Sequence, residues 1–131
     1  MKEVLTFLQK NPTFFIATVE GDQPRVRPFG AVAEFEGKLY FVTGNQKEVF
    51  KQLQKNPKVE ICGMEGSDKW MRVTAEIVID SRKPAVEKML ADNRSLDGLY
   101  TVDDGIVEVF YLKNATATFY SFTSEPKTIQ F

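Results

Sequence analysis

Two arginines and a proline, close together near the N-terminus, have types and a spacing that suggest ligand binding. Arg25 and Arg27 are two residues apart in PRVRPFG, so on a strand both side chains point to one face. Pro28 follows them, and proline donates no hydrogen bond to a sheet, so we expect the ladder to break or to form an edge here. Two cations beside open backbone groups would suit a planar anionic ligand. The alternative is that both arginines flank a hairpin and are simply solvated.

Lys47 is a third candidate, because it lies at the start of the helix expected at residues 46–56. Asn45 is a favourable N-cap, and Glu48 follows three residues later, as in a capping box. A cation in the first turn opposes the helix dipole by a few tenths to about 1 kcal/mol. An anion bound there would reverse this cost, and Thr43 and Asn45 could add hydrogen bonds to a phosphate. Capping explains Asn45 and Glu48 but not Lys47, so a plain helix start and a phosphate site both stay open.

Trp70, the only tryptophan, lies at the start of a long strand expected at residues 69–80 and shares a face with Arg72. It either caps the hydrophobic core, which is the commoner role of tryptophan, or offers a flat surface on which a ring system stacks.

The rest of the composition excludes several chemistries. There is no histidine, which removes histidine-based triads and the usual general base at neutral pH. Cys62 is the only cysteine; it allows no internal disulfide, makes a zinc site implausible and fits a reducing cytoplasm. We expect Cys62 to be structural. The net charge of -1 gives no basic footprint for nucleic acid, and no apolar run approaches the roughly 20 residues that cross a membrane.

The periodicity around these residues predicts one domain over residues 1–131, mainly β with inserted helices. Helices are expected at 2–10, 46–56 and 83–92. Strands are expected at 13–19, 24–35, 38–43, 58–65, 69–80, 106–113 and 115–122. Strands arranged as hairpins around one core indicate a closed or nearly closed antiparallel barrel rather than a parallel sheet. Both faces of residues 24–35 and 69–80 look buried, which favours a homodimer.

Three segments carry a resemblance to a known family: PRVRPFG, YFVTGNQKEVFKQLQKNPKVEICG and WMRVTAE. With the length and the order of elements, they make the chain similar to the pyridoxamine 5'-phosphate oxidase-like proteins, in their small general-stress-protein branch. The resemblance spans nearly the whole chain. It implies an antiparallel split β-barrel of the FMN-binding type, and a homodimer with an FMN site at each end of the shared interface.

The resemblance also assigns cofactor-binding residues. It implies that Arg25, Val26, Arg27 and Pro28 lie along the isoalloxazine ring and reach the phosphate side. It implies that Val42, Thr43, Asn45, Gln46 and Lys47 hold the ribityl phosphate. Trp70 is similar in position to residues that the second subunit supplies.

The expected function is therefore FMN binding, with a flavin-dependent oxidoreductase acting on an unidentified small molecule as the favoured activity. No catalytic side chain and no metal ligand is nominated, and neither nucleic acid nor a membrane is expected as a partner. The chain has no arginine and histidine pair near its C-terminus, which argues against oxidation of pyridoxamine phosphate itself. The alternatives are a non-catalytic flavin-binding stress protein and a binder of another ring cofactor, a deazaflavin or haem.

Overall fold

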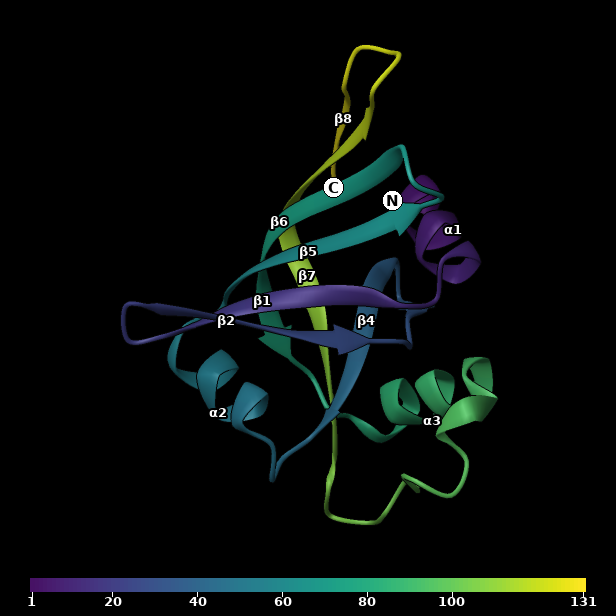
Figure 1. The fold of residues 1–131 in the computed structure, drawn as a ribbon. Coiled ribbons are helices and arrows are strands. Elements are labelled where there is room, and N and C mark those ends of the chain that lie inside the picture. Colours follow the sequence, from purple (N-terminus) through teal and green to yellow (C-terminus); the bar gives the residue numbers. More distant parts are fainter.

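An eight-stranded antiparallel sheet with three α-helices forms the structure, a computed structural model that describes residues 1–131 (Figure 1). The helices are α1 (Lys2–Lys10), α2 (Glu48–Lys55) and α3 (Lys83–Asp92), with a 3-10 turn η1 (Arg94–Leu96). The strands are β1 (Phe14–Glu20), β2 (Gln23–Phe29), β3 (Ala33–Phe35), β4 (Lys38–Gly44), β5 (Lys58–Glu65), β6 (Lys69–Ile79), β7 (Val107–Ser121) and β8 (Lys127–Gln130).

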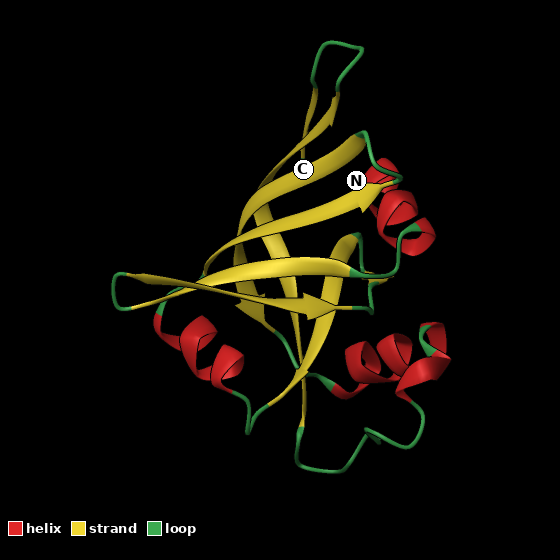
Figure 2. Cartoon of the chain, in the orientation of Figure 1, coloured by secondary structure: helices red, strands yellow, loops and turns green.

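The sheet is strongly curved but not closed (Figure 2). Its strands are ordered β2-β1-β5-β6-β7-β4-β3, so β2 and β3 are free edges. β7 has three partner strands: β6 pairs along most of its length, β4 pairs with its first half, and β8 pairs with its second half. The expected mainly-β split barrel is confirmed, and of the closed and nearly closed forms that the strand pattern left open, the structure has an unclosed sheet.

The prediction of one strand over residues 24–35 is wrong, because the chain changes partner at Gly30. β2 pairs with β1 as far as Phe29, whereas β3 pairs with β4 at the opposite edge of the sheet. Pro28 lies inside β2 and is tolerated because β2 has only one neighbouring strand. The break places the irregular segment at Gly30–Ala31 in the same pocket lining as Arg27.

The two strands expected at 106–113 and 115–122 form the single strand β7. Asn114, at the expected boundary, takes a left-handed φ of 52°. The register against β6 shifts at this point, between Thr74 and Glu76. A β-bulge thus absorbs the irregular residue and bends the strand without ending the ladder. The C-terminal segment then returns as β8 and forms the hairpin that projects beyond the sheet in Figure 1.

The core consists of two clusters of buried side chains. The larger fills the concave side of the sheet and includes Val4 and Leu8 of α1 and Leu53 of α2. The smaller lies between α3 and the β3–β4–β7 edge, and includes Met89 and Tyr40. β6 contributes alternate residues to the larger cluster, so within one chain only one face of this strand is buried. Burial of its other face against a second copy stays a prediction.

A polar cluster fixes α3 against β4. The buried Tyr40 hydroxyl donates to Asp80 over 2.7 Å, and Arg82 donates to both Asp80 oxygens and to Glu36. Hydrogen bonds from Arg82 and from Tyr40 lower the pKa of Asp80 to about 2. Burial and the Asp80 carboxylate raise the pKa of Tyr40 to about 12. This cluster sets the position of α3 and of the segment that follows it.

Candidate functional site

A pocket of about 270 Å³ lies where the end of β2, the end of β4 and the start of α2 meet the segment after α3. From the β2 side come Arg27, Pro28, Phe29, Gly30 and Ala31. From β4 and α2 come Val42, Thr43, Lys47 and Val49. The opposite wall is Ser95, Leu96, Leu99 and Tyr100. The pocket combines apolar walls with two cations and several hydroxyl groups.

Arg27 is held on one side by two neutral acceptors. Its Nη1 donates to the Ile16 carbonyl over 3.0 Å, and its Nη2 donates to Gln52 Oε1 over 2.7 Å. No carboxylate lies within ion-pair distance of Arg27, although Arg25, Arg82 and Arg94 all have one. Burial lowers the pKa of Arg27, but a guanidinium stays charged at neutral pH. The pocket therefore contains an uncompensated positive charge.

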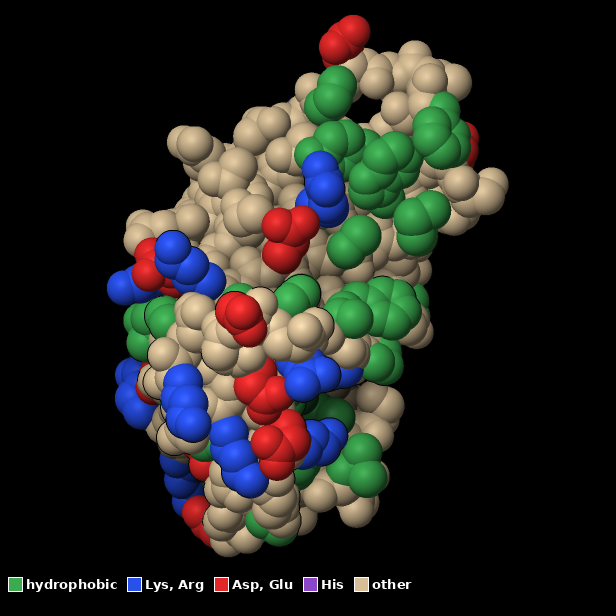
Figure 3. All heavy atoms as spheres, turned by 60° about the vertical axis from the view of Figure 1, so that its left-hand side comes forward, with side chains coloured by type: hydrophobic (Ala, Val, Ile, Leu, Met, Phe, Trp, Pro, Cys, Tyr) green, Lys and Arg blue, Asp and Glu red, His purple; other side chains and the backbone are tan.

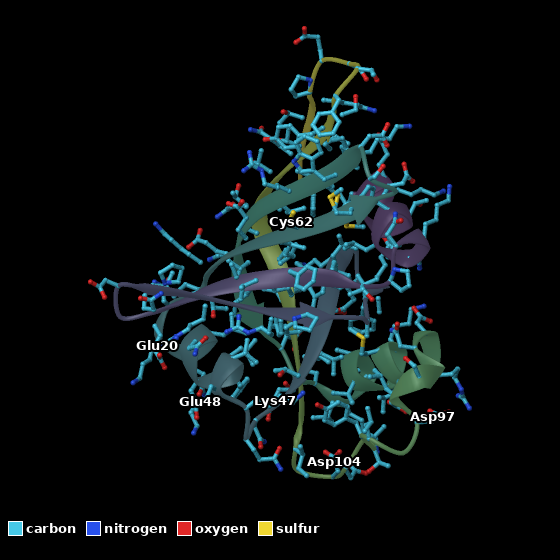
Figure 4. The ribbon with its side chains drawn as sticks, in the orientation of Figure 1. Glu20, Lys47, Glu48, Cys62, Asp97 and Asp104 are labelled. Atoms are coloured by element: carbon cyan, nitrogen blue, oxygen red, sulfur yellow. The ribbon has the colours of Figure 1, made fainter.

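Lys47 is the N-cap residue of α2, with extended backbone dihedrals and no side-chain cap. It forms no ion pair, whereas Glu48 beside it pairs with Lys51 over 3.2 Å. Figure 4 shows Lys47 between α2 and the segment that carries Asp97 and Asp104. A second unpaired cation thus lies in the pocket beside the free N–H groups of the first turn of α2.

The predicted capping box is wrong. Asn45 Nδ2 donates to the Gly105 carbonyl over 2.9 Å and to Glu108 over 3.1 Å, so this side chain ties the segment before α2 to the loop before β7. Helix α2 starts at Glu48, two residues later than expected, because that bond and the one from the Asn45 N–H to Ile106 keep Asn45 out of the helix.

The structure brings Arg27, Pro28, Val42, Thr43 and Lys47 together in the pocket lining. The other predicted cofactor-binding residues lie outside that lining. Gln46 is beside it, since its Oε1 and the Tyr100 hydroxyl both lie 3.2 Å from the position of a Cβ at Gly44.

Arg25 and Val26 lie farther along the β1–β2 hairpin. Arg25 pairs with Glu20 over 2.9 Å, and the Val26 side chain is exposed. Glu20 therefore neutralises one of the two arginines that the spacing placed on one face. In this chain only Arg27 reaches the pocket.

Trp70 lies on the convex face of the sheet, away from the pocket lining. Its ring stacks on Tyr120 at 5.2 Å and 9° and is tilted against Phe122. Arg72 donates to the Tyr120 hydroxyl and lies over its ring. Figure 3 shows a group of hydrophobic side chains in the upper part of the molecule and a larger number of charged side chains lower down. Trp70 therefore belongs to an aromatic surface, not to the pocket of its own chain.

Cys62 lies on the same convex face, level with Phe15 and Arg72 in the strand register. It is partly buried, and burial raises its thiol pKa. It does not line the pocket.

Sequence reasoning missed the wall at Ser95, Leu96, Leu99 and Tyr100, because nothing in the local pattern of this polar loop marks it as part of a site. It also missed Gln52. For Gln52 there was a signal: an amide side chain in the buried stripe of α2, between Val49 and Leu53.

Two further features concern the lengths of the helices and the arrangement of side chains that could bind metal. None of the helices is long and apolar enough to cross a membrane. No group of three or more His, Cys, Asp or Glu side chains is arranged to hold a metal ion.

Comparison with known proteins gives a family match. The family model described as pyridoxamine 5'-phosphate oxidase matches residues 1–104. A solved structure of a NimC/NimA family protein from Clostridium acetobutylicum shares 49% identity with a TM-score of 0.97, over 100% of this chain and 92% of that chain. No curated protein matches.

More distant structures share the fold. General Stress Protein 26 from Bacillus anthracis is 19% identical with a TM-score of 0.77, over 99% of this chain and 97% of that chain. A heme binding protein from Mycobacterium smegmatis is 15% identical with a TM-score of 0.73, over 98% of this chain and 56% of that chain.

Proposed function

The chain belongs to the pyridoxamine 5'-phosphate oxidase family, and from this premise we propose that it binds FMN in the pocket between β2, β4 and α2. The favoured activity is that of a flavin-dependent oxidoreductase acting on a small molecule. FMN joins a planar, largely apolar ring system to a phosphate dianion, so a site for it needs an apolar slot and a concentration of positive charge.

The observation that carries the proposal is the pair of cations in the pocket that no carboxylate neutralises, Arg27 and Lys47. Arg27 is partly buried, so its uncompensated charge is costly and a bound anion offsets that cost, whereas Lys47 is exposed and adds positive charge to the lining. The first turn of α2 adds free backbone N–H groups and the positive end of a helix dipole beside Lys47. A phosphate is the anion that such a combination suits.

The remaining lining suits the ring system. Phe29, Ala31, Val42, Leu96 and Leu99 supply apolar surface on both sides of the pocket. Hydroxyl groups from Thr43, Ser95 and Tyr100 are available to the polar edge of a flavin. When bound, FMN would supply hydride or electron transfer at its N5 atom, and the chain would supply orientation, charge and exclusion of water. We assign no acid or base side chain.

We also propose that a second copy of the chain completes the site. The pocket of about 270 Å³ is small for FMN, since sites for drug-sized ligands measure roughly 300–1,000 Å³. The convex face of β5, β6 and β7 offers a surface for that copy: Trp70 and Tyr120 stack there, and Met64 and Phe122 are exposed beside them. Aromatic and methionine side chains are enriched at protein interfaces.

Two alternatives to an FMN-dependent enzyme can be tested on the same purified protein. A non-catalytic flavin-binding protein would use the same site and differ only in turnover. The likeness to a heme binding protein, at 15% identity, shows that the two chains share a fold and does not by itself support a haem site. No histidine is present to ligate haem iron, and Cys62 lies outside the pocket lining.

The test is the absorbance spectrum of the purified protein, followed by mass spectrometry of the ligand released on denaturation. Flavin absorbance and the mass of FMN are expected, and a colourless protein should bind added FMN. A haem spectrum would contradict the proposal, as would a correctly folded protein that does not bind FMN. Oxidation of a reduced nicotinamide with an added acceptor then separates an enzyme from a flavin carrier.

A further inference from the structure

Gln52 is one of three buried polar side chains in the chain, with Thr18 and Thr43. It lies in the apolar stripe of α2 beside Val49 and Leu53, where a leucine would pack without any polar group to satisfy. A buried amide at such a position therefore calls for specific hydrogen-bond partners.

The partners of Gln52 lead to the pocket. Its Oε1 accepts from the Thr18 hydroxyl over 2.5 Å and from Arg27 Nη2 over 2.7 Å. Arg27 Nη1 donates to the Ile16 carbonyl over 3.0 Å. The guanidinium plane is thus fixed by acceptors on α2 and on β1. A guanidinium carries five N–H donors, so those not used here remain for a ligand.

The charge of these acceptors matters as much as their position. Gln52 and the Ile16 carbonyl are neutral, whereas Arg25, Arg82 and Arg94 are each paired with a carboxylate. A glutamate in place of Gln52 would hold Arg27 equally well but would cancel its charge. The neutral amide fixes the side chain and leaves the full positive charge in the pocket.

We propose that Gln52 is a positioning residue, which holds Arg27 in the pocket through a neutral acceptor so that the charge of Arg27 acts on a bound anion. The identity of that anion, the FMN phosphate, rests on the proposed function. The positioning itself does not, because it is a property of Gln52, Thr18 and Arg27.

Two substitutions separate position from charge. Gln52→Glu keeps the acceptor and its shape but adds a negative charge, and Gln52→Leu removes the acceptor without adding a charge. Gln54, an exposed residue of the same helix, supplies matched controls as Gln54→Glu and Gln54→Leu. Each variant is measured in two ways: ¹⁵N NMR of the Arg27 guanidinium in the full chain, and titrations with FMN and with riboflavin.

Restricted rotation of the Arg27 guanidinium is expected in the wild type and in Gln52→Glu, and freer rotation in Gln52→Leu. Both Gln52 substitutions should weaken FMN by at least about 10-fold, the lower end of what a charge-assisted hydrogen bond contributes. Riboflavin, which has no phosphate charge, should change much less. In an Arg27→Ala background, Gln52→Leu, which adds no charge, should cause no further loss, since residues that act through one another are not additive.

Gln52→Glu with wild-type affinity for FMN would overturn the proposal, as would unchanged Arg27 rotation in Gln52→Leu. Losses that merely add to that of Arg27→Ala would show a purely structural role. If the wild type binds no FMN, the proposed function fails on its own, and the NMR comparison still decides whether Gln52 positions Arg27.

Discussion

At the scale of single residues, the pocket depends on which cations remain unpaired. Arg25 and Arg27 have the same residue type and the same strand face, yet Glu20 neutralises one, whereas neutral acceptors hold the other. Lys47 is likewise free while Lys51, one turn later, pairs with Glu48. The two cations that line the pocket therefore keep their charge, because no acidic partner lies beside them.

Lys47→Ala tests the phosphate side of the site. The substitution removes a charge-assisted hydrogen bond to a dianion, a loss of about 1.5–3 kcal/mol, so affinity for FMN should fall roughly 10- to 100-fold. Affinity for riboflavin should barely change, and the free protein should keep its stability because a cation leaves the positive end of a helix dipole. Paired titrations with the two flavins measure this.

Lys51→Ala is the matched control, since Lys51 lies on the same helix outside the pocket lining. Equal losses for both flavins in Lys47→Ala would mean that Lys47 acts through the fold or the ring. Unchanged affinity for both flavins would mean that Lys47 is simply a solvated surface residue.

Cys62 should react slowly with thiol reagents. Its side chain is partly buried and its pKa is raised by burial, so little thiolate is present at neutral pH. Met64→Cys in a Cys62→Ser background places a thiol at an exposed position of the same strand and should react faster. Labelling of the native protein at the rate of a free thiol would contradict the assignment.

At the scale of elements, the cluster of Tyr40, Asp80, Arg82 and Glu36 joins the β3–β4 turn to the start of α3. It thereby fixes the helix that precedes the pocket wall at Ser95–Tyr100. The exposed ion pair between Arg82 and Glu36 contributes little by itself. The bond from the buried Tyr40 hydroxyl is the larger contribution, because a buried donor without an acceptor is costly.

Asp80→Asn should lower the free energy of unfolding by about 1–3 kcal/mol at pH 7, since a charged acceptor serving Tyr40 and Arg82 is lost. The folded-state pKa of Asp80 is depressed, so its stabilisation is fully present above the ordinary value of 3.8 and is lost as the pH falls toward about 2. Denaturant unfolding at several pH values measures both effects.

Asp92→Asn, which breaks the exposed pair with Lys88, is the control and should change stability by at most about 0.5 kcal/mol. A gap between wild type and Asp80→Asn that is equally wide at pH 2 would contradict this origin.

At the scale of the whole molecule, the proposal of a second copy rests on the convex aromatic face and the small pocket. The wild type should sediment as a dimer at micromolar concentration. Trp70→Asp puts a charge on this face, beside Tyr120 and Met64, and should yield a monomer with weaker FMN binding. Gln54→Asp, at an exposed position of α2, should leave the dimer intact. A wild type that sediments as a clean monomer would exclude the dimer.

The sequence by itself determined the helical or strand character of the segments as far as β7, the bounds of α1 and α3 to the residue, and a broken or edge position for the strand that contains Pro28. These follow from local rules: apolar periodicity and the missing N–H of proline. It also singled out Arg25, Arg27 and Lys47 as candidate ligand-binding cations, and did not distinguish Arg25 from Arg27.

Only the tertiary structure decided which partners those residues meet. The break at Gly30 arises because β2 and β3 pair with different edges of the sheet. Asn45 does not cap the helix, because its side chain donates hydrogen bonds to Gly105 and Glu108, about 60 residues later in the chain. Thr18, Arg27 and Gln52 meet although 25 and 34 residues separate Gln52 from the other two. A local pattern encodes which face of an element is buried, whereas hydrogen-bond partners and pocket walls depend on where distant elements pack.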